Sequence, residues 1–437
     1  MLLLGMVLTA QAALAAEEPS RPVLEEARKL LDKRQPNQAY ELLAPYEYDW
    51  AGNPEYDSLL GTAAAASGRQ DEAAMALERA VASNPDDREA RTALARSYRD
   101  TGDVELARRE LDYLGLQSLP ADRSTDFDRY SARAAAEPGP RERGFRYFVL
   151  LDSGYDSNVN ASNDDDFFLG IRLDDRNVER DSGYAAVSNG GNLAVPLSPN
   201  WTYGMGFNLI QRRYFSETFA NTDRAGLSNE FVWRSGPTEI NFGAGLHTVY
   251  LDSRAPYDGE HSQSGANLGF GARWFMGESR WQIGTDVVAA ALRHENSTRI
   301  FDVDQVLHDV TLNYLGQGSL PTFGFALIGG EAHAKKSGSP YGRDLLGTSF
   351  TSSWSVGEPG RMYSYMSVIK SSYDGSFFGE QRDDTQYGAG LSAILSIFAS
   401  PNWHLIPHLA YIRNESDVAL FDYRRTEIGL AFRWISD

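Results

Sequence analysis

The sequence predicts a two-domain protein, with an N-terminal all-α helical repeat and a C-terminal antiparallel transmembrane β-barrel of about 14 strands. Three observations lead to this prediction: a 34-residue self-similarity near the N-terminus, a polar–apolar alternation of period two over the rest, and connections that alternate in length. We expect a signal peptide at 1–16, the helical domain at 17–119, a linker at 120–143 and the barrel at 144–437.

Composition and charge exclude several classes of function. The 437 residues include no cysteine, which rules out disulfides, cysteine nucleophiles and thiolate metal sites. The net charge of −19 argues against a nucleic-acid partner, because no basic excess is present to displace counterions from phosphates. Beyond residue 16, no run approaches the roughly 18 apolar residues that a membrane-spanning helix needs.

The first segment has the pattern of a secretory signal peptide. Met1–Ala16 is apolar and ends in small residues, and the tripeptide 13–15 (Ala-Leu-Ala) is the best match to a cleavage site. The segment lacks the positive charge that usually precedes the apolar part, so a short buried helix is the alternative. We expect the mature chain to leave the cytoplasm.

The helical repeat extends from residue 22 to about residue 119. Its 34-residue period relates Leu60 to Leu94, Gly68 to Gly102, Ala73 to Ala107 and Leu77 to Leu111. Small residues at Gly61 and Ala73 let two antiparallel helices approach closely, while Leu77 fills the space between them. The copy at Pro54–Asp87 closely resembles the tetratricopeptide repeat (TPR), and a degenerate copy precedes it.

The first helix of each pair in such repeats lines a concave groove that commonly holds a peptide or a partner domain. In this chain that face would carry polar residues of both charge signs, namely Glu55, Ser58, Thr62, Glu89, Thr92, Arg96 and Arg99. Two interpretations are open: the face binds a protein client, or it packs against the rest of this chain.

From Gly144 onward the pattern changes to the period of a β-strand. Near the C-terminus, for example, Ile428 and Leu430 alternate with Glu427 and Gly429. Fourteen such segments occur, approximately at 145–160, 184–196, 201–215, 225–235, 239–253, 264–276, 280–294, 303–316, 322–335, 345–357, 361–374, 385–398, 403–415 and 423–435. Each has room for the roughly 9–11 residues with which a tilted strand crosses a bilayer.

The connections between these segments alternate between short and long. Short turns such as 235–237 (Ser-Gly-Pro) alternate with polar loops such as Ala161–Gly183 and Gly375–Asp384, as in outer-membrane barrels. An even strand number returns the C-terminus to the short-turn side. The helical domain precedes the first strand on that side, so we expect it in the periplasm.

Tryptophan placement supports the barrel independently. The seven tryptophans after Trp50 are Trp201, Trp233, Trp274, Trp281, Trp354, Trp403 and Trp434. All lie near short-turn ends of predicted strands, as expected for an aromatic girdle at a membrane–water interface. A soluble sandwich would also alternate but would have no reason to sort tryptophan to one end. We therefore expect a Gram-negative outer-membrane protein that contacts lipid and is placed there by the barrel-insertion machinery.

The predicted lumen face mixes small residues with both charge signs. Its charged members include Glu230, Arg234, Asp286, Asp309, Glu427 and Arg433. Polar groups inside a barrel need water or mutual pairing, and either would satisfy them. The glycines on this face leave a wide lumen unless a plug fills it, or they ease strand curvature.

No pattern of catalytic or metal-ligating residues stands out. His404 and His408 lie four residues apart, which on a strand separates them by about 13 Å, too far to share one metal ion. The other histidines are scattered singly, and no nucleophile motif accompanies any of them, His308 included. We expect a protein that is not an enzyme, with no catalytic residue, no cofactor and no metal site.

The segment that opens the barrel carries a short motif. Residues 151–160 read LDSGYDSNVN, and the motif positions are Gly154, Tyr155, Asp156, Asn158 and Asn160. Behind a TPR-like domain, this segment resembles the Gly-Tyr-Asp-x-Asn-x-Asn opening of the barrel in the surface lipoprotein assembly modulator (Slam) family.

This resemblance implies an outer-membrane translocator that assists surface display or secretion of a lipoprotein or another protein client. The TPR domain would engage the client or a periplasmic chaperone, and the barrel would give passage, with no catalytic residue. The alternatives are an exopolysaccharide export channel, a porin with an accessory TPR domain and an adhesin-like scaffold. A channel for a charged polymer predicts a lumen of one charge sign, whereas the lumen residues above carry both.

Overall fold

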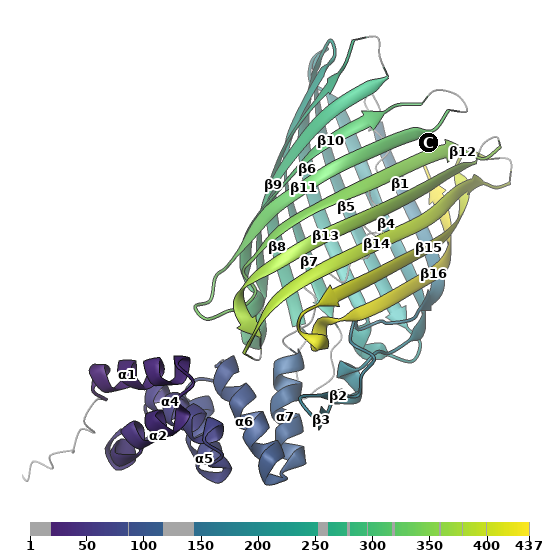
Figure 1. Ribbon diagram of the computed structural model, residues 1–437. Coiled ribbons are helices and arrows are strands. Elements are labelled where there is room, and N and C mark those ends of the chain that lie inside the picture. The colour runs from purple at the N-terminus through teal and green to yellow at the C-terminus, as the bar shows by residue number, and fades with distance from the viewer. Residues whose placement is uncertain are drawn as a thin grey trace, which may run out of the picture. The chain divides into compact units, whose positions relative to one another are not determined.

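The computed structural model describes residues 19–116 except 86, and residues 144–436 except 252–260, 278–279, 295, 317–319, 358–359, 378 and 399. The chain divides into a helical unit and a β-barrel unit (Figure 1). The predicted signal peptide at 1–16 and the predicted linker at 120–143 lie outside the described residues. None of the described helices is both long enough and apolar enough to cross a membrane.

Helix pairs build the helical unit. They are α1 (Arg21–Asp32) with α2 (Pro36–Leu43), α4 (Pro54–Ala66) with α5 (Gln70–Ser83), and α6 (Arg88–Thr101) with α7 (Val104–Leu116). A short 3₁₀ turn, η1 (Ala44–Tyr46), and α3 (Glu47–Trp50) follow the first pair. The second and third pairs correspond to the two clear copies of the 34-residue period and the first pair to the degenerate copy. The predicted all-α repeat is therefore confirmed.

Local sequence explains why α4 begins and pairs as it does. The side-chain oxygen of Asn53 accepts hydrogen bonds from the backbone N–H groups of Glu55 and Tyr56, at 3.1 and 3.0 Å, which caps the helix. Further along α4, a Cβ added to Gly61 would lie 2.5 Å from Cγ of Leu77 on α5. Only glycine permits this close approach of the two helices.

Fourteen antiparallel strands form a closed barrel, in agreement with the predicted number. They are β1 (Gly144–Asp156), β4 (Ser182–Pro196), β5 (Trp201–Tyr214), β6 (Thr222–Ser235), β7 (Thr238–Leu251), β8 (His261–Phe275), β9 (Trp281–His294), β10 (Val303–Tyr314), β11 (Thr322–Ala334), β12 (Arg343–Ser355), β13 (Arg361–Phe377), β14 (Glu380–Ser396), β15 (Trp403–Ser416) and β16 (Tyr423–Ile435). Each strand pairs with its neighbour in sequence, and β16 pairs with β1 (Figure 1). We call β1 and β16 the closing pair.

The connections contain a little regular structure. A small hairpin of β2 (Phe167–Phe168) and β3 (Ile171–Arg172) belongs to the connection between β1 and β4, as does the 3₁₀ turn η2 (Asp175–Asn177). Other connections carry the 3₁₀ helices η3 (Thr218–Ala220), η4 (Asn296–Phe301) and η5 (Ala419–Phe421). All of these elements lie in the longer connections.

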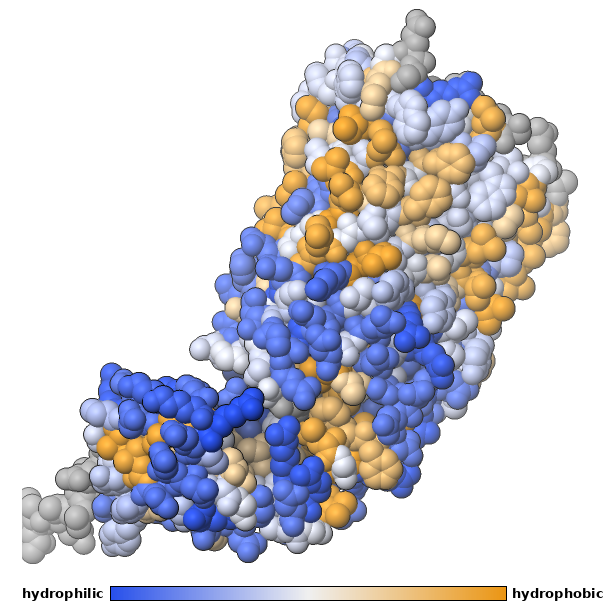
Figure 2. Space-filling view, in the orientation of Figure 1, coloured by the Kyte–Doolittle hydropathy of each residue, from blue (hydrophilic) through white to orange (hydrophobic). Residues whose placement is uncertain are grey.

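The outer surface of the barrel carries an apolar belt. Along β5 the outward positions are Trp201, Tyr203, Met205, Phe207 and Leu209, followed by the polar Gln211 and Arg213. The apolar stretch from 201 to 209 fits the roughly 9–11 residues of a bilayer-crossing strand. Figure 2 shows a broad zone of apolar side chains on the visible face of the barrel, bordered by polar surface. A closed barrel with such a belt is an outer-membrane β-barrel.

The tryptophans confirm the orientation of the belt. All seven of the barrel lie within two residues of a strand end on the short-turn side. Trp201 is paired with Trp233 in the strand register, and Trp403 is paired with Trp434, whose ring centroid lies 6.3 Å away. The girdle therefore marks the membrane interface on the short-turn side.

Candidate functional site

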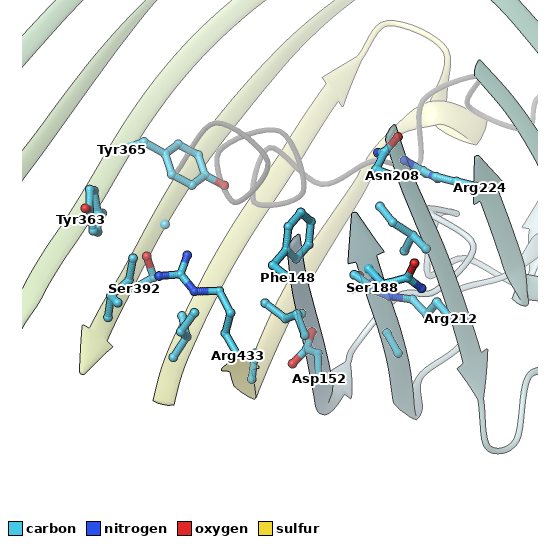
Figure 3. Close-up of a pocket in the computed structure, with 18 of the residues that line it drawn as sticks. Phe148, Asp152, Ser188, Asn208, Arg212, Arg224, Tyr363, Tyr365, Ser392 and Arg433 are labelled. Carbon is cyan, nitrogen blue, oxygen red and sulfur yellow. The ribbon is translucent and has the colours of Figure 1, made fainter. Parts of the chain in front are cut away.

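The barrel lumen contains a cavity of about 630 Å³ lined by β1, β4–β6 and β11–β16. Most lining side chains are small or neutral and polar, among them Ser188 and Ser392 (Figure 3). The charged ones are Asp152, Arg212, Arg224 and Arg433. The wall of the cavity is thus rich in hydroxyl groups and has an excess of arginine over acidic residues.

One wall of the lumen holds a buried network centred on Tyr184 of β4. The hydroxyl oxygen of Tyr184 lies 3.2 Å from Oδ2 of Asp152 on β1, 3.1 Å from Nε2 of His408 on β15 and 3.1 Å from Oε1 of Glu427 on β16. All four side chains are buried, with Tyr184 fully so. The Tyr184 side chain thereby reaches across the closing pair to β15.

Two arginines complete this network. Arg212 of β5 donates to both carboxylate oxygens of Glu427, at 3.0 and 3.1 Å, and its guanidinium group lies 4.2 Å from the centre of the Tyr184 ring. Arg425 of β16 pairs with both oxygens of Asp156 at 3.0 and 2.5 Å. Such forked pairs are geometrically specific, and burial makes the loss of one partner costly.

We call this set the closing-strand network; its members are Asp152, Asp156, Tyr184, Arg212, Tyr214, His408, Arg425 and Glu427. They come from the adjacent strands β5, β4, β1, β16 and β15. The network therefore joins the N-terminal and C-terminal strands of the barrel from the lumen side.

A pair of glycines makes room for the network. Gly154 of β1 stands opposite Gly429 of β16 in the closing pair. A Cβ added to either residue would lie 2.8 or 2.7 Å from the Tyr184 hydroxyl oxygen, closer than real Cβ contacts. The two glycines are therefore what allows Tyr184 to lie across the junction.

The structure assigns contacts to each position of the motif that opens the barrel. Gly154 makes the room just described, and Asp156, which is fully buried, accepts from Arg425 and from the Tyr214 hydroxyl. Tyr155 points outward, and its hydroxyl donates to Oδ2 of Asp181 at 3.0 Å. The motif thus contributes to barrel closure.

The remaining motif positions correct the predicted end of the first strand. We predicted this strand to extend to residue 160, but β1 ends at Asp156. The Asn158 side chain donates to the carbonyl oxygens of Ser162 and Arg424, at 2.8 and 2.9 Å, and the Asn160 side chain donates to the carbonyl oxygen of Val178. These side-chain bonds replace the strand ladder, as asparagine commonly does in turns.

The other predicted lumen residues are distributed around the barrel. On the β6–β9 wall, Glu230 accepts from Asn241, Arg234 pairs with Glu239, and Arg273 lies 3.3 Å from Asp286. Asp309 of β10 stands opposite Asp286 and shares its lumen face. Glu427 belongs to the closing-strand network and Arg433 to the cavity wall. The six predicted residues thus do not form one site.

The predicted groove of the helical unit is partly occupied by internal contacts. Glu55 pairs with Arg28 at 2.8 Å, the Ser58 hydroxyl donates to Asp87 at 3.3 Å, and Arg99 pairs with Asp100 at 2.8 Å. Thr92 is buried and donates to the Arg88 carbonyl, while Thr62 is half-buried and Glu89 and Arg96 are exposed. Nearby in the core, burial raises the pKa of Tyr56, whose hydroxyl donates to the Leu43 carbonyl at 3.0 Å.

Sequence reasoning missed Tyr184, Arg212 and the partners of His408. His408 was weighed only against His404 on its own strand, whereas its neighbours in space are carboxylates on β1 and β16. The available signal was the alternation itself, because His408 and Glu427 share the lumen face of adjacent strands. His308, by contrast, lies on the outer face, opposite Val287 and Gly329.

One comparison with known protein families concerns the helical unit. A family model described as tetratricopeptide repeat matches residues 64–122. No curated protein matches the chain. The match begins near the end of α4 and includes α5, α6 and α7, so the helical unit contains tetratricopeptide repeats.

Several solved structures are similar to this chain, and the three described next are all low in sequence identity. A FadL homologue of Pseudomonas aeruginosa is 10% identical over 68% of this chain and 90% of its own, with a TM-score of 0.37. OccAB3 of Acinetobacter baumannii is 8% identical over 67% and 99%, with a TM-score of 0.37. OmpTΔL8, an outer membrane protein of Vibrio cholerae, is 9% identical over 67% and 99%, with a TM-score of 0.36.

Proposed function

We propose that this protein is an outer-membrane translocator that assists surface display or secretion of a lipoprotein or another protein client. In this proposal the TPR domain lies in the periplasm and engages the client or its chaperone, and the barrel gives passage. No residue is assigned a catalytic step. The observation that carries the proposal is the union, in one chain, of a TPR domain and a closed barrel with a lumen cavity of about 630 Å³.

Each half of this union supports one part of the proposal. TPR domains present extended surfaces to protein partners, and an ordinary solute channel does not need one. On α6, Glu89 and Arg96 remain exposed on the predicted groove face and offer both charge signs to a polypeptide. The lumen likewise carries both charge signs, and its cavity has many neutral hydroxyl groups that suit a passing polar chain.

A second candidate is a channel for anions or an anionic polysaccharide. It is favoured by one observation: the cavity is lined by Arg212, Arg224 and Arg433 but by only one acidic residue, Asp152, among the described lining residues. A steady anion-selective current through the purified protein in planar bilayers would support this candidate. Currents that appear only with a protein client would support the translocator.

The translocator is tested by cross-linking and by client display. A photo-reactive amino acid is placed at Glu89 on the groove face of α6, and for comparison at Met75, which is exposed on α5. We expect a client adduct from position 89 and a much weaker one from position 75. Deleting residues 22–119 should abolish protease-accessible client on intact cells. Unchanged client display, with the barrel still inserted, would contradict the proposal.

A further inference from the structure

Four side chains of the closing-strand network bring one nitrogen and three oxygens together in the geometry of a metal site. Around the Tyr184 hydroxyl oxygen at 3.1–3.2 Å lie Oδ2 of Asp152, Nε2 of His408 and Oε1 of Glu427. Nε2 of His408 lies 3.8 Å from each carboxylate oxygen, and all three lie within 4.8 Å of one another. A tetrahedral zinc ion with bonds near 2.0–2.1 Å separates its ligand atoms by about 3.3 Å. The three distances to the Tyr184 oxygen match this value, and the two 3.8 Å spacings would have to shorten by about 0.5 Å on binding.

When His408 is neutral, the four side chains of this cluster carry two negative charges and no positive charge. Nδ1 of His408 lies 3.4 Å from the carbonyl oxygen of Ile406, which favours the tautomer that directs the Nε2 lone pair at the other three groups. Two carboxylates, one imidazole nitrogen and one phenol oxygen then share the single proton of the Tyr184 hydroxyl. Arg212 donates to Glu427 in this group. A cation among the four atoms would satisfy them.

A second observation points to a ligand independently. Oδ1 of Asp152 is buried and has no hydrogen-bond partner, although its side chain is only 5% exposed. The same residue lines the lumen cavity, so the cluster can be reached from the lumen (Figure 3). A buried carboxylate oxygen without a partner is costly unless an ion or another group compensates it.

The surroundings also resemble those that hold metal ligands in place. The contact of His408 with a backbone carbonyl orients its ring, and the two hydrogen bonds from Arg212 orient the carboxylate of Glu427. The whole network contains three carboxylates, from Asp152, Asp156 and Glu427. It contains two guanidinium groups, from Arg212 and Arg425. Its net charge is therefore −1 when His408 is neutral.

We propose that Asp152, Tyr184, His408 and Glu427 form a site for a divalent transition-metal ion of the zinc class. On binding, the Tyr184 O–H bond breaks, an oxygen–metal bond forms and the proton leaves to water, so the network becomes electrically neutral. An imidazole ligand and four close donor atoms favour zinc over calcium or magnesium, which prefer six or more oxygens. The ion would tie β4, β1, β16 and β15 together. This proposal is independent of what the barrel transports.

The test measures zinc bound to the purified full-length chain, made without a polyhistidine tag. After treatment with EDTA and equilibration with zinc, atomic emission should find about one zinc ion per chain. His408→Gln should lower the zinc affinity at least about tenfold, because a ligand is lost. His404→Gln is the matched control, since His404 lies on the same strand and the same lumen face; it should bind zinc like the natural chain.

A second measurement does not depend on the variants. Cobalt(II) added to the natural chain should give the visible absorption of tetrahedral cobalt, and one equivalent of zinc should remove it. Absence of stoichiometric zinc in the natural chain would overturn the proposal. So would equal losses in His404→Gln and His408→Gln, or a cobalt spectrum of octahedral type.

Discussion

The hydroxyl oxygen of Tyr184 on β4 lies 3.1 Å from Oε1 of Glu427 on β16, although β1 runs between these two strands. This contact is possible because Gly154 and Gly429 leave the lumen side of the closing pair without side chains. The same carboxylate receives two hydrogen bonds from Arg212 on β5. Glu427 on β16 therefore connects the C-terminal strand of the barrel to β4 and β5 on the other side of β1.

Replacing Glu427 by alanine should strongly destabilise the barrel. The change leaves the buried Arg212 without its carboxylate and removes one acceptor from Arg425, and breaking such a buried pair costs about 3–5 kcal/mol. Samples heated to successive temperatures before gel electrophoresis should lose the band of the folded barrel at a clearly lower temperature. The control is Glu230→Ala, because Glu230 faces the lumen but is exposed to it, and we expect a change within about 0.5 kcal/mol. Equal effects of the two variants would contradict this account.

A charge in the centre of the apolar belt should destabilise the barrel in lipid. Met205 lies on the outer face of β5, mid-way along its apolar positions, and is 50% exposed. Met205→Arg should cost about 2–4 kcal/mol in reversible unfolding from vesicles. Gln211→Arg, on the same face but beyond the belt, should cost about 0–1 kcal/mol. If the two variants unfolded alike, the belt would not be the membrane-embedded surface.

Filling the space at Gly61 should disable the helical unit alone. A leucine side chain at this position collides with Leu77 of α5, and overpacking of this kind costs about 1–3 kcal/mol or more. Gly61→Leu should make the helical unit sensitive to protease and remove the client adduct at position 89. Ala66→Leu, at an exposed position of the same helix, should do neither. The folded barrel band serves as an internal control, and its loss would contradict the independence of the two units.

Removing arginines from the cavity wall should change ion selectivity if the lumen conducts. Arg224→Ser combined with Arg433→Ser should lower the chloride-to-potassium permeability ratio at least about twofold, measured from the reversal potential in a salt gradient. Arg234→Ser combined with Arg273→Ser removes the same two charges from lumen positions outside the cavity lining and should have a smaller effect. If the variants inside and outside the cavity lining changed the ion selectivity equally, the cavity wall would not be the part of the lumen that selects ions.

Much of the fold was predictable because its signals are local. Alternation identifies a strand within a few residues and states the face of each side chain, as it did for Glu427 and Gly429. The composition of the turns predicted the short connections, and the positions of the tryptophans predicted the membrane interface on the short-turn side. In the helical unit, the 34-residue period placed Gly61 against Leu77, which the structure confirms. The predicted translocation and the client remain proposals.

The site was less predictable because its contacts join distant parts of the chain. Tyr184 is separated from Glu427 by 243 residues, and Arg212 from Glu427 by 215. Alternation shows that all three face the lumen, but it does not show how far each side chain reaches or which neighbour it selects. The strand that lies between Tyr184 and Glu427 can be bridged only because of two glycines, whose combined effect no single segment reveals.

The position of the closing-strand network has a consequence for assembly. Asp156 meets Arg425, 269 residues later, only after every intervening strand has been added. Until then these charged groups lack the partners that satisfy them in the closed barrel, so incomplete intermediates are less stable and the last step becomes cooperative. A chain truncated before β16 loses Arg425 and Glu427 together, so Asp156 and Arg212 would both lack the partners that they have in the closed barrel.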